Sequence, residues 1–449
     1  MRAIGRTRRG HPLRNNVVIV GVRWRRSNLP SFAHRRAEIS GIVRRSRSVV
    51  AISAAVGGVV GAGVFGLEAL VEWGFETVSN QQLWVVAITP AVGLVAANVV
   101  LRTRRPVSAA TSDEFLRAFH GPESKLPLLA ALRRLAASVL TIASGGALGL
   151  EGPSMYGGSA VGSAFQRRLS RYFQGVDHRT LMVAGAAAGI SAVFKAPVTG
   201  TVFAMEVPYR NDMARHMLLP ALVSSATSYL VFASLTDTSP ILVHDSLAGG
   251  TFSIVDVLGA MVIGAVCAVI ARAFAKMIRF AKSAPGRLLL VRVGFSATGL
   301  AALVVASNAL VGAPLSIGGG YQVFREWLFV ENELAVGTIA AILLVRSLAT
   351  AFTVYGGGAG GLFVPLVVNG GLVGRAVAEI LHPEQASLYT FLGVAAFLGA
   401  GYRVPLAAVV FVAESTGSPI YVVPALFAAV MADIVMGDQS ITAYQRDET

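Results

Sequence analysis

Apolar segments long enough to cross a membrane recur along most of this chain. A helix needs about 20 apolar residues to span about 30 Å of hydrocarbon. Six uninterrupted segments reach that length, at 48–72, 82–101, 215–235, 252–280, 288–311 and 334–354. We therefore predict an all-α protein that crosses a membrane several times.

Glycine and proline break four further apolar segments, at 126–165, 180–207, 357–380 and 388–414. A helix that ends inside a membrane leaves backbone groups without partners, so such breaks are tolerated where protein or a water-filled cavity surrounds them. Interrupted helices of this kind mark the binding sites of many transporters. We expect these four segments to surround a transport pathway.

An internal repeat links the first half of the chain to the second. GLEGP at 149–153 matches GLFVP at 361–365 at an offset of 212 residues, and two later glycines match at the same offset. The offset then becomes 208, where 183–207 lies over 392–415. At this offset Pro197, Phe203, Glu206 and Lys195 meet Pro405, Phe411, Glu414 and Arg403. Composition alone would not place a proline, a phenylalanine, an acid and a cation at one spacing.

Two such halves predict an inverted repeat with the binding site between them. We take the halves as 48–235 and 251–446, joined by a linker at 236–250 and preceded by an Arg-rich segment at 1–47. Each half is too long to be a unit of a solenoid.

Both repeated turns begin with glycine and end with proline, which suits a loop that leads into the first turn of a helix. Unpaired N–H groups and the positive end of the helix dipole make such a start attractive to an anion. We expect anion-binding backbone at Gly149, Leu150 and Gly152 in the first turn. In the second turn we expect it at Gly361, Leu362, Phe363 and Val364. Two facing helix starts would favour anions without the full charge that would hold them too tightly.

Glu151 lies inside the first turn, where an ionisable residue within a membrane segment indicates function. Its carboxylate can occupy an anion site in place of the permeating ion, and protonation would release it. We predict that Glu151 is a gate; the alternative is a carboxylate that only caps the helix. We expect the Phe363 ring to line the pathway, with plain packing as the alternative.

Charge is concentrated at one end of the chain. Residues 1–47 carry thirteen arginines and a single acid, a net +12 of the formal +14 for the whole chain. We interpret this as a cytoplasmic flank under the positive-inside rule, with anionic lipid headgroups as a further attraction. A transit peptide is the alternative for residues 1–40. No nucleic-acid motif accompanies the arginines, so we expect no nucleic-acid partner.

Few other residues suggest a chemical function. Charged residues make up 14% of the chain, whereas about 25% is usual in soluble proteins. Cys267 is the single cysteine, and the seven histidines show no metal-binding spacing. We therefore expect no metal site, no cofactor and no catalytic residues, and we expect that the protein is not an enzyme.

The two glycine–proline turns, GLEGP and GLFVP, resemble the GKEGP/GREGP and GxFxP motifs of the CLC family of chloride channels and proton–chloride antiporters. The likeness covers about residues 48–446. The resemblance implies a homodimer with one pore per subunit, bound chloride ions, and Glu151 as the external gate. It also places Leu362 and Phe363 at the central anion site. The nucleotide-sensing C-terminal CBS domains of many eukaryotic relatives are not expected.

Departures from the family pattern affect the central site. The family's GSGIP motif should fall near 106–113, where the chain reads PVSAATSD. Ala110 takes the usual serine position, and Ser108 or Thr111 would supply a hydroxyl if the loop shifts. The family's central tyrosine is expected within STGSPIYVVP, where Tyr421 is the candidate.

The family's internal proton-loading glutamate corresponds to Val207, since Glu206 matches the residue before it. Channels of the family commonly have valine there. We therefore favour a passive channel for chloride or a similar small monovalent anion, with a proton-coupled antiporter as the alternative. A secondary transporter of an organic solute is the more distant alternative. The expected location is a bacterial inner membrane, with an organelle membrane as the alternative.

Overall fold

The computed structural model describes residues 32–103, 106–122, 125–169, 177–236, 252–283, 288–329 and 335–447. The chain divides into two units, Met1–Arg44 and Arg45–Thr449, and the functional residues belong to the second. The expected linker at 236–250 lies outside the described residues, except for Thr236, as do residues 1–31 of the Arg-rich segment.

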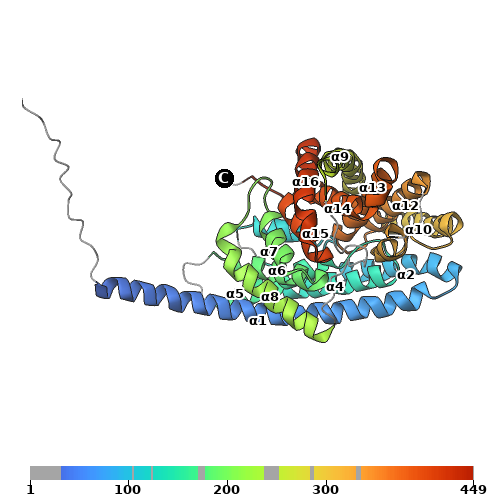
Figure 1. Cartoon of the computed structure of the whole chain (residues 1–449). Helices are drawn as coiled ribbons and strands as arrows, with labels where there is room; N and C mark the ends of the chain where they lie inside the picture. Colours follow the sequence, from blue (N-terminus) through green and yellow to red (C-terminus); the bar gives the residue numbers. More distant parts are fainter. Residues whose placement is uncertain are drawn as a thin grey trace, which may run out of the picture. The chain divides into compact units, whose positions relative to one another are not determined.

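Helices dominate the described part of the chain (Figure 1). The first half holds α1 Phe32–Ser79, α2 Leu83–Arg102, α3 Ser112–Phe119, α4 Leu128–Ala143, α5 Glu151–Arg168, α6 Thr180–Phe194, α7 Pro197–Glu206 and α8 Leu218–Leu235. The second half holds α9 Ile254–Ser283, α10 Leu289–Val311, α11 Tyr321–Val323, α12 Val336–Tyr355, α13 Phe363–Leu381, α14 Ala386–Tyr402, α15 Pro405–Thr416 and α16 Val422–Met436. The only strand-like pairings among the described residues are isolated bridges.

Eight helical segments of the described residues are long and apolar enough to cross a membrane. Six of them correspond to the six uninterrupted segments expected from the sequence, which are α1, α2, α8 with its preceding turn, α9, α10 and α12. The other two are α13 and the segment Pro419–Met436, which contains α16 and was missing from our six.

The predicted breaks fall where glycine and proline stand. Three of the four interrupted segments divide into two helices each: α4 and α5, α6 and α7, and α14 and α15. Lys195 follows α6 with φ of 50°, and Arg403 follows α14 with φ of 58°. These are the only left-handed non-glycine residues in the described part of the chain, and they occupy matching positions of the sequence repeat. A proline two residues later begins the next helix in both cases.

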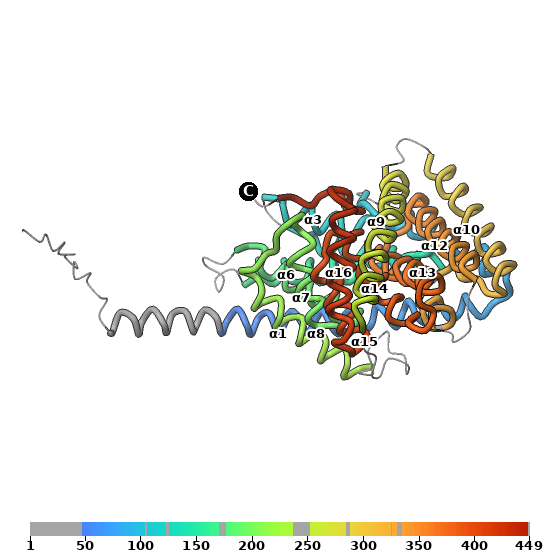
Figure 2. Tube along the Cα trace, turned by 45° about the horizontal axis from the view of Figure 1, so that its top comes forward, coloured from blue at the N-terminus to red at the C-terminus, as the bar shows by residue number. Residues whose placement is uncertain are grey.

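Close helix packing surrounds the breaks. Helix α5 packs on α6. Helix α13 packs on α14 in the second half (Figure 2). A Cβ atom on Gly158 would lie 2.1 Å from the carbonyl oxygen of Gly185, and one on Gly370 would lie 2.4 Å from that of Gly393. Only glycine allows the paired helices to approach this closely.

Helices α7 and α15 cap each other through two glutamates. Glu414, near the end of α15, accepts hydrogen bonds from the backbone N–H groups of Val198 (2.9 Å) and Thr199 (2.6 Å) at the start of α7. The Thr199 hydroxyl donates a third bond of 2.6 Å to the same carboxylate.

Glu206, at the end of α7, accepts the equivalent bonds from Leu406 (3.1 Å) and Ala407 (2.8 Å) at the start of α15. Proline at the first position of each helix has no N–H group, so each carboxylate accepts hydrogen bonds from the N–H groups of the next two residues. The matched glutamates of the repeat, Glu206 and Glu414, thus both cap helix starts.

The caps lead to a stability prediction. Glu414→Ala leaves two N–H groups of α7 without an acceptor in an apolar setting, which costs about 1–3 kcal/mol per unsatisfied group. We expect a lower midpoint of thermal unfolding in detergent, and a similar loss for Glu206→Ala. Exposed Glu76, on α1, provides the control, because Glu76→Ala should leave the midpoint unchanged. An unchanged midpoint for both cap variants would show that water or lipid replaces the carboxylates.

Candidate functional site

The two glycine–proline turns meet as a short antiparallel bridge. The N–H of Gly149 donates to the carbonyl of Gly361 (3.0 Å), and the N–H of Gly361 donates to the carbonyl of Gly149 (2.7 Å). Helix α5 begins at Glu151 and α13 begins at Phe363, so two helix N-termini lie beside this bridge. Their dipoles favour negative charge at this point.

The Glu151 carboxylate occupies the space between the turns. Its Oε1 accepts a hydrogen bond of 2.5 Å from the backbone N–H of Phe363, at the start of α13. Its Oε2 is buried and has no hydrogen-bond partner among the described residues. A Cβ atom on Gly149 or Gly361 would lie 2.0 or 2.1 Å from a carboxylate oxygen, so the side chain fits only because both residues are glycine.

The Phe363 ring is fully buried in an aromatic cluster and is not part of the cavity described below. Its centroid lies 4.3 Å from that of Phe194, 5.0 Å from Phe411, 5.4 Å from Phe203 and 6.5 Å from Tyr402. The geometry therefore brings the Phe363 backbone, and not its ring, to the Glu151 carboxylate.

A cavity of about 580 Å³ leads from the protein surface towards this point. The buried residues Leu362 and Tyr402 line it, as do the N-terminal residues of α3. The Tyr402 hydroxyl interacts with the Ser112 side chain and with the Leu362 backbone, and Glu151 is close enough to influence it electrostatically. Tyr402 thus lines the cavity and lies near the Glu151 carboxylate.

The loop at 106–113 joins this wall. Ser108 and Thr111, the candidate hydroxyl residues of the sequence, both line the cavity. The Thr111 hydroxyl donates to the carbonyl of Gly360 (3.4 Å), and the Ser108 hydroxyl accepts from the N–H of Ala110 (3.1 Å). Ala110 also forms a parallel bridge with Gly360, which fixes this loop against the second turn.

Tyr421 does not reach the cavity. Its ring lies 5.5 Å from that of Phe391, near the beginning of α14. Tyr402 lies at the end of the same helix, and at about 1.5 Å per residue it is roughly 16 Å from Phe391 along the helix axis. The tyrosine beside Leu362 is therefore Tyr402, where α14 ends, and not the candidate that we took from the sequence.

Val207 is fully buried at the end of α7. Its carbonyl accepts a hydrogen bond of 3.0 Å from the side chain of Gln445, which also donates to the carbonyl of Tyr402 at 2.7 Å. The C-terminal segment thus connects the ends of α7 and α14.

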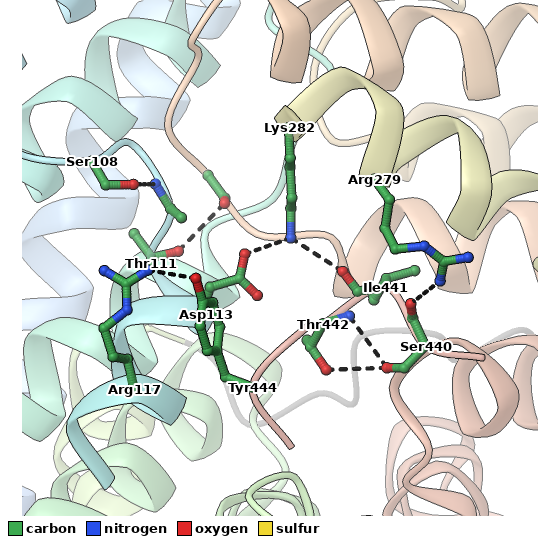
Figure 3. Close-up of polar contacts among 12 residues, drawn as sticks. Ser108, Thr111, Asp113, Arg117, Arg279, Lys282, Ser440, Ile441, Thr442 and Tyr444 are labelled. Atoms are coloured by element: carbon green, nitrogen blue, oxygen red, sulfur yellow. Dashed lines mark hydrogen bonds and ion pairs between the residues drawn. The ribbon is translucent and has the colours of Figure 1, made fainter. Parts of the chain in front are cut away.

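Cations dominate the charged lining of the cavity. Five cationic residues and two acidic ones line it: Arg102, Arg117, Arg279, Lys282, Arg292, Asp113 and Glu114. Residues 441–444 complete the rim, and several lining cations bind this segment (Figure 3). Arg279 donates to the carbonyl of Ser440 (2.5 Å), and Arg117 donates to the hydroxyl of Tyr444 (2.6 Å). The excess of positive charge makes the cavity a favourable place for anions.

Sequence reasoning missed Tyr402, Ser112 and the C-terminal rim. Tyr402 had a weak signal, because at the offset of 208 it matches Phe194, immediately before the matching pair Lys195 and Arg403. Its hydroxyl has no counterpart in the first half, so the repeat gave no hint of a polar role. The rim residues lie beyond the last long helix and belong to no repeated segment.

Comparison with known proteins defines the class. The family model described as "Voltage gated chloride channel" matches residues 92–437. This match covers most of the chain, which therefore belongs to the CLC family of voltage-gated chloride channels and Cl⁻/H⁺ antiporters. It is a multi-pass membrane protein for anion transport and not an enzyme.

Two bacterial relatives are similar over most of their length. A putative chloride channel protein ClcB-like of Ralstonia nicotianae is 26% identical over 77% of this chain and 81% of its own. A voltage-gated ClC-type chloride channel ClcB of Citrobacter koseri is 26% identical over 80% of this chain and 85% of its own.

Solved structures share the fold. A slow cyanobacterial Cl⁻/H⁺ antiporter matches with a TM-score of 0.75 at 19% identity, over 87% of this chain and 95% of that one. A CLC-type fluoride/proton antiporter matches with a TM-score of 0.73 at 20% identity, over 90% and 98%. At these identities the likeness establishes the CLC fold.

Proposed function

We propose that this protein conducts chloride or a similar small monovalent anion passively, through a pore that Glu151 gates. The contact between the Glu151 carboxylate and the N–H of Phe363 carries the proposal. A negatively charged group already binds this helix start, and a permeating anion would need the same donor. Movement of the side chain would free the donor for the ion.

The proposed central anion site lies beside the two turns, and the two halves form an inverted repeat around it. The matching left-handed residues after α6 and α14, and the reciprocal caps of α7 and α15, support this arrangement. Backbone groups of Gly149, Leu150 and Gly152, with those of Gly361, Leu362, Phe363 and Val364, would supply the donors. The hydroxyls of Tyr402 and Ser112 are additional candidates because both line the cavity.

Passive conduction is favoured by Val207. An apolar, fully buried side chain at that position offers no carboxyl group for protons from the cavity side. One observation favours the antiporter alternative: the cyanobacterial structure and the fluoride/proton structure are both described as proton antiporters. One of them is described as a fluoride/proton antiporter, so fluoride also belongs among the ions to be tested. Family membership speaks against the organic-solute alternative.

We further propose a homodimer in a bacterial inner membrane, with the cavity on the cytoplasmic side. The end of α2 and the end of α9 both border the cavity, and Arg102, Arg279 and Lys282 stand there. Cationic residues at helix ends favour the cytoplasmic face. Independently of the cavity, the positive-inside rule leads us to propose that the Arg-rich N-terminal segment is cytoplasmic.

The first prediction concerns ion coupling. In liposomes loaded with chloride, we expect the purified protein to release chloride, when a potassium ionophore balances the charge, without counter-movement of protons. Glu151→Gln should increase the rate of release, because a neutral amide no longer competes with the anion for the N–H of Phe363. Chloride electrodes and external pH would be recorded together, and empty liposomes would provide the background.

Three outcomes would change the proposal. Protons driven uphill by a chloride gradient at a fixed ratio would establish the antiporter alternative. Faster release of fluoride than of chloride would change the preferred ion. Absence of any anion release from the wild-type protein and from Glu151→Gln would contradict anion conduction by this chain.

A second prediction separates the two tyrosines. Tyr402→Phe removes one hydroxyl donor beside Leu362, and the loss of one hydrogen bond corresponds to roughly twofold to tenfold weaker chloride binding. Isothermal titration calorimetry in detergent would measure the dissociation constant. Tyr421→Phe is the matched control and should leave it unchanged, because that ring packs on Phe391. The reverse result would restore Tyr421 as the anion-binding tyrosine.

A further inference from the structure

Lys282 lies at the rim of the cavity, in the last turn of α9. Its ammonium group donates to Oδ2 of Asp113 (2.7 Å) and to the carbonyl of Ile441 (3.2 Å), as Figure 3 shows. A lysine ammonium has three N–H donors, so these two bonds leave one donor unused among the described contacts. The side chain is 28% exposed, which leaves it within reach of ions in the cavity.

Asp113 is an unexpected residue in this place. It follows Ser112, which faces Tyr402, so its carboxylate stands close to the path that an anion would take. Only 7% of the residue is exposed, and its Oδ1 is buried without a hydrogen-bond partner among the described residues. An uncompensated carboxylate here would repel anions, and Lys282 is the cation that compensates it.

Other cations of the lining also have hydrogen-bond partners, and one of them, Arg117, pairs with an acid, Glu114 (2.7 Å). Arg279 binds the carbonyl of Ser440 and the side chain of Gln439, and Arg292 binds the carbonyl of Tyr355. These neutral partners fix the guanidinium groups without cancelling their charge. Lys282, like Arg117, is paired with an acid, and its charge is therefore available only to the extent that Asp113 releases it.

We propose that Lys282 is a positioning residue that loads anions into the pore from the cavity, and that Asp113 sets the strength of this loading. The inference rests on the proposed anion conduction. An anion that approaches the rim competes with Asp113 for the ammonium group, and it moves on towards Tyr402 when the ion pair closes again. The acid thus prevents Lys282 from holding the anion, since binding has to stay weak enough for release.

Charge variants test the proposal. The measurement is the chloride concentration that gives half-maximal flux, with gluconate keeping ionic strength constant. Lys282→Gln should raise this concentration by roughly threefold to tenfold, the size expected for one unit of charge in a partly aqueous medium. Asp113→Asn should lower it, because Lys282 is then free to bind anions. The double variant restores the original sum of charges and should return close to the wild-type value.

A chemical test holds the backbone constant and changes only the charge. Lys282→Cys is made in a Cys267→Ser background, which removes the single native thiol. A membrane-impermeant cationic methanethiosulfonate forms a disulfide with the new thiol and restores a positive charge, so the half-saturating concentration should fall towards the wild-type value. The anionic reagent of similar size should raise it further. Both effects apply only to molecules whose cavity faces the reagent.

Lys276 provides the matched control. It is exposed on the same helix and does not line the cavity. Lys276→Gln, and Lys276→Cys with either reagent, should leave the half-saturating concentration unchanged. Equal effects at both lysines would reduce the result to a general charge effect and overturn the proposal.

Other outcomes are equally decisive. If both reagents act alike on Lys282→Cys, bulk and not charge matters, and the proposal fails. If the double variant behaves like Lys282→Gln, Asp113 does not set the loading, and the proposal fails in that part. If wild-type protein carries no anion flux in the same assay, the proposed function itself fails. The variants test only the loading by Lys282, because each is compared with wild-type protein that conducts anions.

Discussion

Every helix that begins inside a membrane has to find partners for its first backbone N–H groups, and this constraint governs the centre of the protein. The starts of α7 and α15 are satisfied by Glu414 and Glu206, each with bonds to two successive N–H groups. At the start of α13, the N–H of Phe363 donates to Glu151, and the N–H of Val364 also faces this carboxylate. Within the described part of the chain, Oε2 of Glu151 has no hydrogen-bond partner, whereas both oxygens of each cap accept bonds. The need to pair the N–H groups of a helix start is thus met by structural caps at α7 and α15. At α13 it is met by the Glu151 carboxylate, which an anion could replace.

Electrostatics along the cavity follow a graded order. At the rim, whole charges stand on Arg279, Lys282 and Arg292, moderated by Asp113. Further in, the hydroxyls of Tyr402 and Ser112 take over. At the centre, partial charges of backbone N–H groups remain. Full charges attract ions from a distance, whereas partial charges bind them without trapping them. This order suits a protein of an anion-transport family, and it requires the α9 end and the C-terminal segment as much as the two central turns.

The sequence was sufficient for most of the spans and for the breaks, because glycine, proline and hydropathy act locally, but the span that contains α16 was missed. The repeat paired Lys195 with Arg403 as matching cations, and the structure adds that both are left-handed. Tyr402 could not be predicted, since only the end of α14 and its approach to α13 turn its hydroxyl towards Leu362. The pair of Lys282 with Asp113 was equally hidden, because it joins residues 169 positions apart that no motif connects. Contacts of that kind depend on how complete helices pack.

The reciprocal caps have a consequence for how the chain is made. Val198 and its acceptor Glu414 are 216 residues apart, so the start of α7 is synthesised long before its cap exists. At about 5–20 residues per second, this interval is on the order of 10–40 s. During that time the N–H groups of Val198 and Thr199 need a temporary partner, such as water, lipid headgroups or the insertion machinery. The start of α7 therefore has to remain in a polar environment until Glu414 has been synthesised and can cap it.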